Sequence, residues 1–193
     1  ERKLRHKAWY ERMAALYERG SKTVTEARRL TDYLLSRPDI DKQRVYLIGA
    51  SYGAMTGAIT AAFDTRFKAV SLVYGGGDLR LMAYNPRLVG HLGPLAPEVG
   101  RWLGLFGAVS DPIYYVGRIS PRPILFQNGD RDSVVIPAAA KAMQDAAREP
   151  KTVVWYPSDH LDLSPEYIPI AVKEGIEWFK KEDEKVQASN TSS

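Results

Sequence analysis

Short apolar segments that alternate with helical patterns constrain the fold of this chain more than any other feature. Each segment is too short for a buried helix and is rich in β-branched or aromatic residues, so each is predicted to be a buried strand. The predicted strands span residues 44–48, 68–78, 122–130 and 151–157. The predicted helices span residues 4–18, 21–38, 52–62, 137–148 and 165–181. Strands that alternate with helices indicate an α/β fold whose mostly parallel sheet is flanked by helices.

A single domain is predicted to take up most of the chain. Its 193 residues, of which 45% are hydrophobic and 26% charged, have the length and composition of one globular domain. Residues 79–120 interrupt the alternation and are rich in Gly, Pro, Leu and aromatic residues, which predicts a small helical cap. We therefore assign residues 1–187 to the domain and the polar residues 188–193 to a disordered tail.

Charge and composition exclude several classes of protein. The net charge of +4 is spread along the chain, so a nucleic-acid-binding surface is not expected. The sequence has no cysteine, which excludes disulfides, a cysteine nucleophile and thiolate metal sites. No apolar run is long enough to span a membrane. The lack of cysteine fits the cytoplasm and an export route equally, so the compartment stays open.

A serine lies between two glycines where a predicted strand meets a predicted helix. Gly49, Ser51 and Gly53 fit the pattern G-x-S-x-G, which is typical of a nucleophile elbow. In such an elbow the glycines remove side chains that would collide with the strand and the helix. The serine oxygen then stands at a helix N-terminus, where backbone N–H groups favour developing negative charge. A glycine-rich turn used only for close packing is the structural alternative.

A serine nucleophile needs a base and an acid that orients the base. The sequence contains three histidines, and only His160 follows the candidate acids, in the loop after the last predicted strand. Three aspartates follow predicted strands, and we rank them Asp132, Asp78 and Asp130. Asp132 comes first because it lies farther beyond its strand than Asp130, which could simply stabilise the turn. Asp159 is interpreted as a local loop anchor.

Three motifs in this order resemble the C-terminal portion of an α/β-hydrolase. They are "GASYGA", "PRPILFQNGDRDSVV" and "VWYPSDH". The sequence is similar to dienelactone-hydrolase-like and acyl-esterase members, and to the catalytic domain of prolyl-oligopeptidase-type peptidases, over roughly residues 23–181. The resemblance implies Ser51 as nucleophile, Asp132 as acid and His160 as base. It implies no metal and no organic cofactor.

The sequence departs from this family before the elbow. Family members place several strands there, and one early loop donates an N–H to the oxyanion hole. Here only helical sequence precedes Arg44, so the backbone N–H of Tyr52 is the one donor that the sequence identifies. The chain also begins at Glu1 rather than at methionine. We therefore expect an N-terminal segment, or a second chain, to complete the fold and the site.

The cap is expected to determine the substrate. Four of its aromatic residues are predicted to bind an apolar acyl or alcohol group, namely Trp102, Phe106, Tyr114 and Tyr115. The resemblance implies a serine esterase that acts on a small-molecule carboxylic ester. A prolyl-oligopeptidase-type peptidase and a non-catalytic small-molecule binder remain alternatives. A nucleotide-binding domain that uses "YGGGD" is disfavoured, because the phosphate-binding G-x-G-x-x-G pattern is missing.

Overall fold

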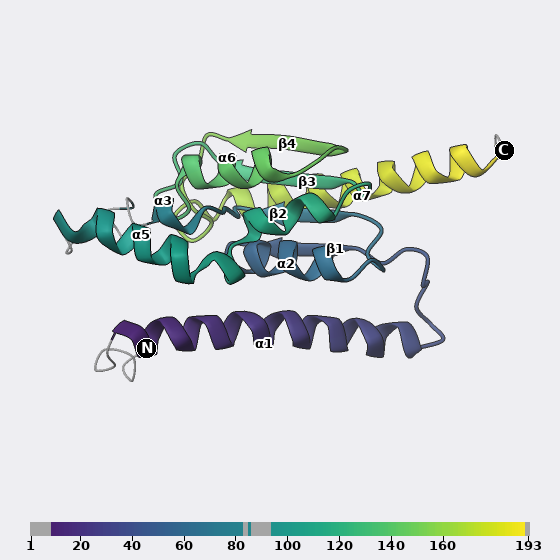
Figure 1. The fold of residues 1–193 in the computed structure, drawn as a ribbon. Coiled ribbons are helices and arrows are strands. Elements are labelled where there is room, and N and C mark those ends of the chain that lie inside the picture. The colour runs from purple at the N-terminus through teal and green to yellow at the C-terminus, as the bar shows by residue number, and fades with distance from the viewer. Residues whose placement is uncertain (1–8, 83–84, 86–93, 192–193) are drawn as a thin grey trace.

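The computed structural model describes residues 9–82, 85 and 94–191, and these residues form one sheet between layers of helices (Figure 1). The sheet has four strands in the order β1-β2-β3-β4, and every neighbouring pair is parallel. Its strands are β1 (Leu47–Ala50), β2 (Val70–Val73), β3 (Ile124–Gly129) and β4 (Lys151–Tyr156). The predicted parallel sheet flanked by helices is confirmed.

Four helices flank the sheet. They are α1 (Trp9–Ser36), α2 (Tyr52–Phe63), α6 (Pro137–Ala146) and α7 (Tyr167–Thr191). Figure 1 shows α2 and α6 in front of the sheet, α7 behind it, and α1 alongside α2 on the β1 side. Because the four strands are parallel, their carboxyl ends lie at the same edge of the sheet, where loops lead into the following helices.

The two faces of the sheet differ in chemistry. Leu47, Val70 and Ile124 share one register and turn toward α2 and the main hydrophobic core. The opposite face carries Ser71 and Gln127, which are fully buried under α7 and hydrogen-bond to each other. Alternation along each strand thus directs apolar side chains to one layer and several satisfied polar side chains to the other.

Small side chains let α2 lie close to the sheet. Ala54, Ala58 and Ala61 have no exposed surface. A Cβ on Gly57 would come within 2.9 Å of a methyl group of Leu47. The alanine-rich sequence after the elbow therefore fixes how close this helix approaches β1 and β2.

Two helices extend beyond their predicted boundaries. Gly20 was expected to separate two helices, yet α1 runs through it without a break. A glycine within a helix costs about 1 kcal/mol relative to alanine, which a long helix packed against a neighbour tolerates. At the other end, α7 continues to Thr191, although disorder was predicted from residue 188. The lysines and glutamates that precede this tail are good helix formers, and the helix continues from them into the last polar residues.

The described part of residues 79–120 is helical, as the predicted cap requires. It comprises α3 (Leu79–Met82) and α5 (Ala96–Phe106), followed by three short 3-10 helices. These are η3 (Ala108–Ser110), η4 (Pro112–Tyr114) and η5 (Val116–Arg118). The two α-helices lie so close together that a Cβ on Gly104 would be 2.4 Å from the Arg80 side chain. Residues 83–84 and 86–93 of the predicted cap lie outside the described residues.

Strand β1 forms one edge of the sheet. In the part of the chain that the structure describes, no strand precedes it, as the sequence indicated. Ile48 in its middle remains 51% exposed. An apolar strand with a free backbone edge is a surface on which a further strand can pair.

Candidate active site

The serine of the G-x-S-x-G pattern lies in the turn between β1 and α2. Ser51 has φ 54° and ψ −119°, a backbone conformation that residues other than glycine seldom adopt. A Cβ on Gly49 would lie 2.2 Å from the carbonyl oxygen of Gly53, so the turn requires glycine at position 49. A Cβ on Gly53 would meet nothing within 4 Å. The collision expected at both glycines therefore arises only at the first.

Ser51 contacts the histidine of the final loop. Its Oγ lies 2.8 Å from Nε2 of His160, which follows β4. Nδ1 of the same ring lies 2.7 Å from Oδ2 of Asp132, in the loop after β3. His160 and Asp132 are only 5% and 3% exposed, so water does not compete strongly for these contacts. The fold thus brings together the three residues that the sequence singled out.

The second oxygen of Asp132 is also held. Its Oδ1 accepts hydrogen bonds from the backbone N–H groups of Val134 at 2.8 Å and Val135 at 2.7 Å. The carboxylate is therefore oriented by its own loop before it meets the imidazole.

The other two candidate acids have different partners. Asp78 forms an ion pair with Arg80 at 2.6 Å, and the hydrogen bond from this guanidinium lowers the pKa of Asp78. The Asp130 side chain is more than half exposed and lies 3.4 Å from Arg131. Of the three aspartates, Asp132 is the one that meets the histidine.

Asp159 connects the two loops that carry the acid and the base. Its Oδ1 accepts hydrogen bonds from the backbone N–H of Ser133 at 2.7 Å and of His160 at 2.7 Å. The Ser133 hydroxyl donates to the same carboxylate at 2.8 Å. Sequence reasoning expected a local anchor, whereas this residue also reaches the neighbouring loop. The one available signal was adjacency, because Asp159 directly precedes the candidate base and Ser133 directly follows the candidate acid.

Tyr52, the predicted oxyanion donor, is the first residue of α2. The N–H groups of a first helical turn have no partner within the helix, so this group is available to an anion at the elbow. The Tyr52 side chain turns to α1, where the Arg19 guanidinium lies 5.5 Å from its ring centroid. Its phenolic oxygen lies near Gly20. The backbone N–H of Tyr52 thus lies at the elbow, whereas its side chain lies against α1.

Two of the four predicted substrate-binding aromatic residues are exposed. Trp102 on α5 and Tyr114 on η4 are 50% and 57% exposed. Phe106 ends α5, and its side chain lies outside the description.

Tyr115 lies far from the serine. Its ring packs against Phe63, with the centroids 5.4 Å apart, and its hydroxyl donates to the Val109 carbonyl oxygen. Phe63 is the last residue of α2, roughly 16 Å along the axis from Tyr52 at 1.5 Å per residue. Because Ser51 precedes the first residue of this helix, we do not carry Tyr115 into the proposed site.

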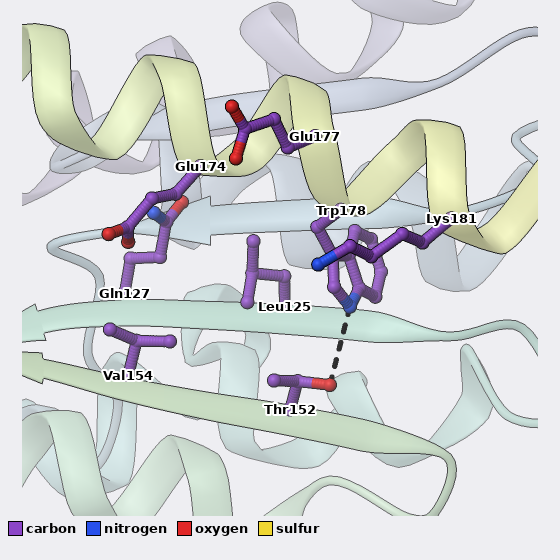
Figure 2. A pocket seen from close by; sticks show the side chains of 8 residues that line it. All are labelled: Leu125, Gln127, Thr152, Val154, Glu174, Glu177, Trp178 and Lys181. Atoms are coloured by element: carbon purple, nitrogen blue, oxygen red, sulfur yellow. Dashed lines mark hydrogen bonds between the residues drawn. The ribbon is translucent and has the colours of Figure 1, made fainter.

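A shallow cleft lies elsewhere, between α7 and the strands β3 and β4 (Figure 2). Its lining consists of Leu125, Gln127, Thr152, Val154, Glu174, Glu177, Trp178 and Lys181. The Trp178 indole donates to Thr152, and Glu174 accepts a hydrogen bond from Tyr156. None of the residues predicted for the site lines this cleft.

Metal ions and membrane spans can be addressed for the described residues. No group of three or more His, Cys, Asp or Glu side chains among them is arranged to hold a metal ion. None of the helices in the described ranges combines the length and apolarity that crossing a membrane requires.

The sequence matches the model of the prolyl oligopeptidase family over residues 4–185. This match spans nearly the whole chain, and the chain therefore belongs to that family. A comparison with curated proteins found no match.

Solved structures with a similar fold include an α/β-hydrolase and two esterases. The α/β-hydrolase GrgF from Penicillium sp. sh18 superposes with a TM-score of 0.64 at 17% identity, covering 84% of this chain and 72% of that one. An acetyl xylan esterase from Paenibacillus sp. R4 gives 0.65 at 18% identity, covering 82% and 52%. A Pyrococcus furiosus esterase gives 0.64 at 16% identity, covering 84% and 62%. These similarities show that the chain has a partial α/β-hydrolase fold.

Proposed function

We propose that this protein is a serine hydrolase that cleaves carboxylic esters through an acyl-enzyme intermediate. The observation that carries the proposal is the continuous contact from Ser51 Oγ through the His160 imidazole to the buried carboxylate of Asp132. Nucleophile, base and acid in this geometry are the requirements for activating a serine hydroxyl. Membership of the prolyl oligopeptidase family supports the serine hydrolase part of the proposal.

In the proposed acylation step, Ser51 Oγ attacks the ester carbonyl carbon while Nε2 of His160 accepts the hydroxyl proton. Asp132 holds Nδ1–H and stabilises the imidazolium that forms. The new C–O bond is made as the carbonyl π electrons move to oxygen. When the intermediate collapses, the bond to the alkoxy oxygen breaks and His160 gives its proton to the leaving alcohol.

In the proposed deacylation step, water takes the place of the alcohol. His160 removes one proton from water while the water oxygen attacks the acyl carbon. The bond between the acyl carbon and Ser51 Oγ then breaks, and His160 returns its proton to that oxygen. The products are a carboxylic acid and the free serine. No metal or organic cofactor takes part in this scheme.

The oxyanion would be stabilised by the backbone N–H of Tyr52 and the N-terminus of α2. We propose that a second donor comes from a segment that pairs along the free edge of β1, either N-terminal to this sequence or in another chain. Removing one such donor typically lowers kcat by about 10²–10³-fold. The exposed Ile48 at that edge supports such pairing.

The proposed substrate has an apolar acyl or alcohol group. Trp102 and Tyr114 are exposed aromatic side chains of the cap, and Tyr114 follows Ile113, which packs near Gly77 beyond β2. Phe106 stays in the proposal on the sequence pattern alone. Exposed aromatic side chains are typical of surfaces that bind apolar groups.

A peptidase is the second candidate, because the family match is to the prolyl oligopeptidases. Ester hydrolysis is preferred as the first test, since an alkoxide leaves more readily than an amide nitrogen. A matched series of esters and anilides that share one acyl group separates the two functions. An anilide turned over as fast as its ester would favour the peptidase.

The first test is labelling with a fluorophosphonate, which phosphonylates an activated serine. Rapid labelling mapped to Ser51, and lost in Ser51→Ala, is the expected result. Absence of labelling in a folded sample, both alone and together with a segment that completes the β1 edge, would contradict the proposal. Labelling at another serine would contradict it as well.

A further inference from the structure

We infer that Tyr74 is a positioning residue that holds the His160 imidazole in its reactive orientation, an inference that rests on the proposed function. Tyr74 directly follows β2 and has no exposed surface. Its φ of 51° lies in the left-handed region, which a bulky aromatic residue seldom occupies. A strained backbone persists only where surrounding contacts enforce it, and such residues cluster at functional sites.

Backbone contacts from two neighbouring strands enforce this conformation. The Tyr74 N–H donates to the Gln127 carbonyl oxygen at 2.6 Å. The Ser51 N–H donates to the Val73 carbonyl oxygen at 2.8 Å. The elbow and the strained tyrosine are therefore joined through one peptide unit at the end of β2.

The strained backbone places the aromatic ring against the imidazole. The ring centroids of Tyr74 and His160 lie 5.9 Å apart and their planes meet at 82°. Edge-to-face contacts of this kind are favourable and directional. Contacts with Asp132 and Ser51 hold the two imidazole nitrogens. The ring of Tyr74 restricts rotation of the imidazole away from these two contacts.

The hydroxyl of Tyr74 acts on the loop rather than on the ring. It forms a hydrogen bond with Ser158, two residues before His160. A Cβ on Gly129 would lie 2.5 Å from the Ser158 carbonyl oxygen and 3.0 Å from the Tyr74 ring. Glycine at the end of β3 thus leaves the space in which this loop and this ring meet.

Nothing in the proposed chemistry otherwise uses Tyr74. Burial raises the pKa of its phenol above the ordinary value, so at neutral pH it stays protonated and is not a proton acceptor. Its partners are internal: His160, Ser158 and Tyr156, whose ring stacks on it at 6.3 Å. The effect of Tyr74 on the reaction is therefore expected through His160 and not through substrate.

Two variants of Tyr74 and one matched control test this inference. Tyr74→Leu removes the ring, Tyr74→Phe removes only the hydroxyl, and Tyr156→Phe removes a hydroxyl from the adjacent stacked ring. The Tyr156 hydroxyl bonds Glu174 at 2.6 Å and Gln127 at 2.7 Å, away from His160. All three changes alter the same pair of stacked tyrosines, but only the first two affect the histidine or its loop.

Hydrolysis of an activated ester is the first readout. We expect Tyr74→Leu to lower kcat by about 10²-fold with little change in KM, as a small misplacement of a catalytic group does. Tyr74→Phe should show a smaller loss, and Tyr156→Phe should keep the original kcat. Unchanged kcat in Tyr74→Leu, or equal losses in Tyr74→Leu and Tyr156→Phe, would overturn the inference.

Nuclear magnetic resonance of the His160 Nδ1 proton gives a readout that does not need activity. In ¹⁵N-labelled protein this hydrogen-bonded proton should give a deshielded signal, which His160→Gln assigns by its loss. We expect the signal to exchange faster and broaden in Tyr74→Leu, to change less in Tyr74→Phe, and to stay in Tyr156→Phe. An unaltered signal in both Tyr74 variants would overturn the inference. If Tyr74→Leu does not fold, Tyr74→Phe decides by the same two readouts.

The design separates this inference from the proposed function. An unmodified protein with neither ester hydrolysis nor Ser51 labelling would contradict the function, and the imidazole signal would still test the role of Tyr74. Activity that depends on Ser51 but not on Tyr74 would overturn the positioning role alone.

Discussion

The proposed site has two parts that are held in different ways. The acid–base part, which comprises the loops after β3 and β4, depends on side-chain hydrogen bonds that link Asp132, Asp159 and His160. The elbow part, which comprises β1, its turn and α2, depends on backbone shape and close packing at Gly49 and Ser51. Polar contacts therefore orient one part, and steric fit shapes the other.

This difference predicts how each part fails. A changed carboxylate in the acid–base part should reduce reactivity while the core stays folded, because that core is built from apolar contacts elsewhere. A substitution that alters the backbone of the elbow turn should lower both the stability of the fold and the reactivity of Ser51. The following variants test that contrast, from the largest expected effect to the smallest.

Asp132→Asn should have the largest effect on reactivity. The amide can present its NH₂ to the imidazole and favour the wrong tautomer, so we expect kcat to fall by about 10⁴-fold. Initial rates on an activated ester measure the effect, and thermal unfolding should be nearly unchanged. The control is Asp130→Asn, which alters an exposed carboxylate two residues away. Equal losses in the two variants would contradict the assignment of the acid.

Gly49→Ala should disable the elbow and destabilise the fold. Its Cβ would lie 2.2 Å from the Gly53 carbonyl oxygen, so strand and helix must separate. We expect a lower unfolding temperature together with loss of Ser51 labelling. In Gly53→Ala the new methyl group meets nothing within 4 Å. That control should be neutral or more stable by about 0.4–1 kcal/mol. A stable Gly49→Ala protein would show that the turn adapts more freely than we infer.

Asp159→Ala should weaken the link between the acid and base loops. The backbone N–H groups of Ser133 and His160 lose their acceptor, although Asp132 keeps its own loop bonds. We expect kcat to fall by about 10–10²-fold, by analogy with the loss of groups that orient metal ligands. The neighbouring Asp162→Ala is the control. Steady-state kinetics with no change in Asp159→Ala would restrict this residue to a structural role.

Asp64→Asn should affect only stability, because this residue follows α2 at the end opposite Ser51. Asp64 is buried and hydrogen-bonded to Arg66, which lowers its pKa and also pairs with Asp32 on α1. Arg66 is partly exposed, so we expect a loss of about 1–2 kcal/mol at pH 7 in urea unfolding. Ser51 labelling should be unchanged.

The pH dependence of that loss has a definite sign. A carboxyl group whose folded pKa lies below the unfolded value stabilises the protein above the unfolded pKa, near 3.9. This stabilisation disappears as the pH falls through the folded value, so Asp64→Asn and the original protein should converge below about pH 4. Asp39→Asn, which alters the exposed ion pair with Arg37, should cause no measurable loss at any pH.

The sequence pattern predicted the sheet better than it predicted the ends of the helices. Each expected strand contains an observed one, or overlaps it as at β1, because buried β-branched runs and their turns are local signals. Gly20 misled the prediction of α1, because propensity is a weak local preference that packing against α2 overrides. At α7 the polar sequence suggested an end too early, and the helix is longer than the pattern predicted.

The order of the motifs in the sequence was enough to identify Ser51, Asp132 and His160 as candidates. The sequence could not show that Asp78 pairs with Arg80 or that Tyr115 packs against the far end of α2. It also gave no signal for Tyr74, since a positive φ at a buried tyrosine leaves no mark on local composition. These outcomes depend on contacts with other segments.

What the sequence by itself determined is the alternation of strand and helix, the parallel sheet that follows from it, and the tight turn at Gly49 and Ser51. These are set by residue periodicity and by backbone conformations that few residue types permit. Only the tertiary structure decided which carboxylate meets the histidine and which residues hold both in place. Those contacts join positions 28 and 109 residues apart, whose proximity depends on the packing of the whole sheet.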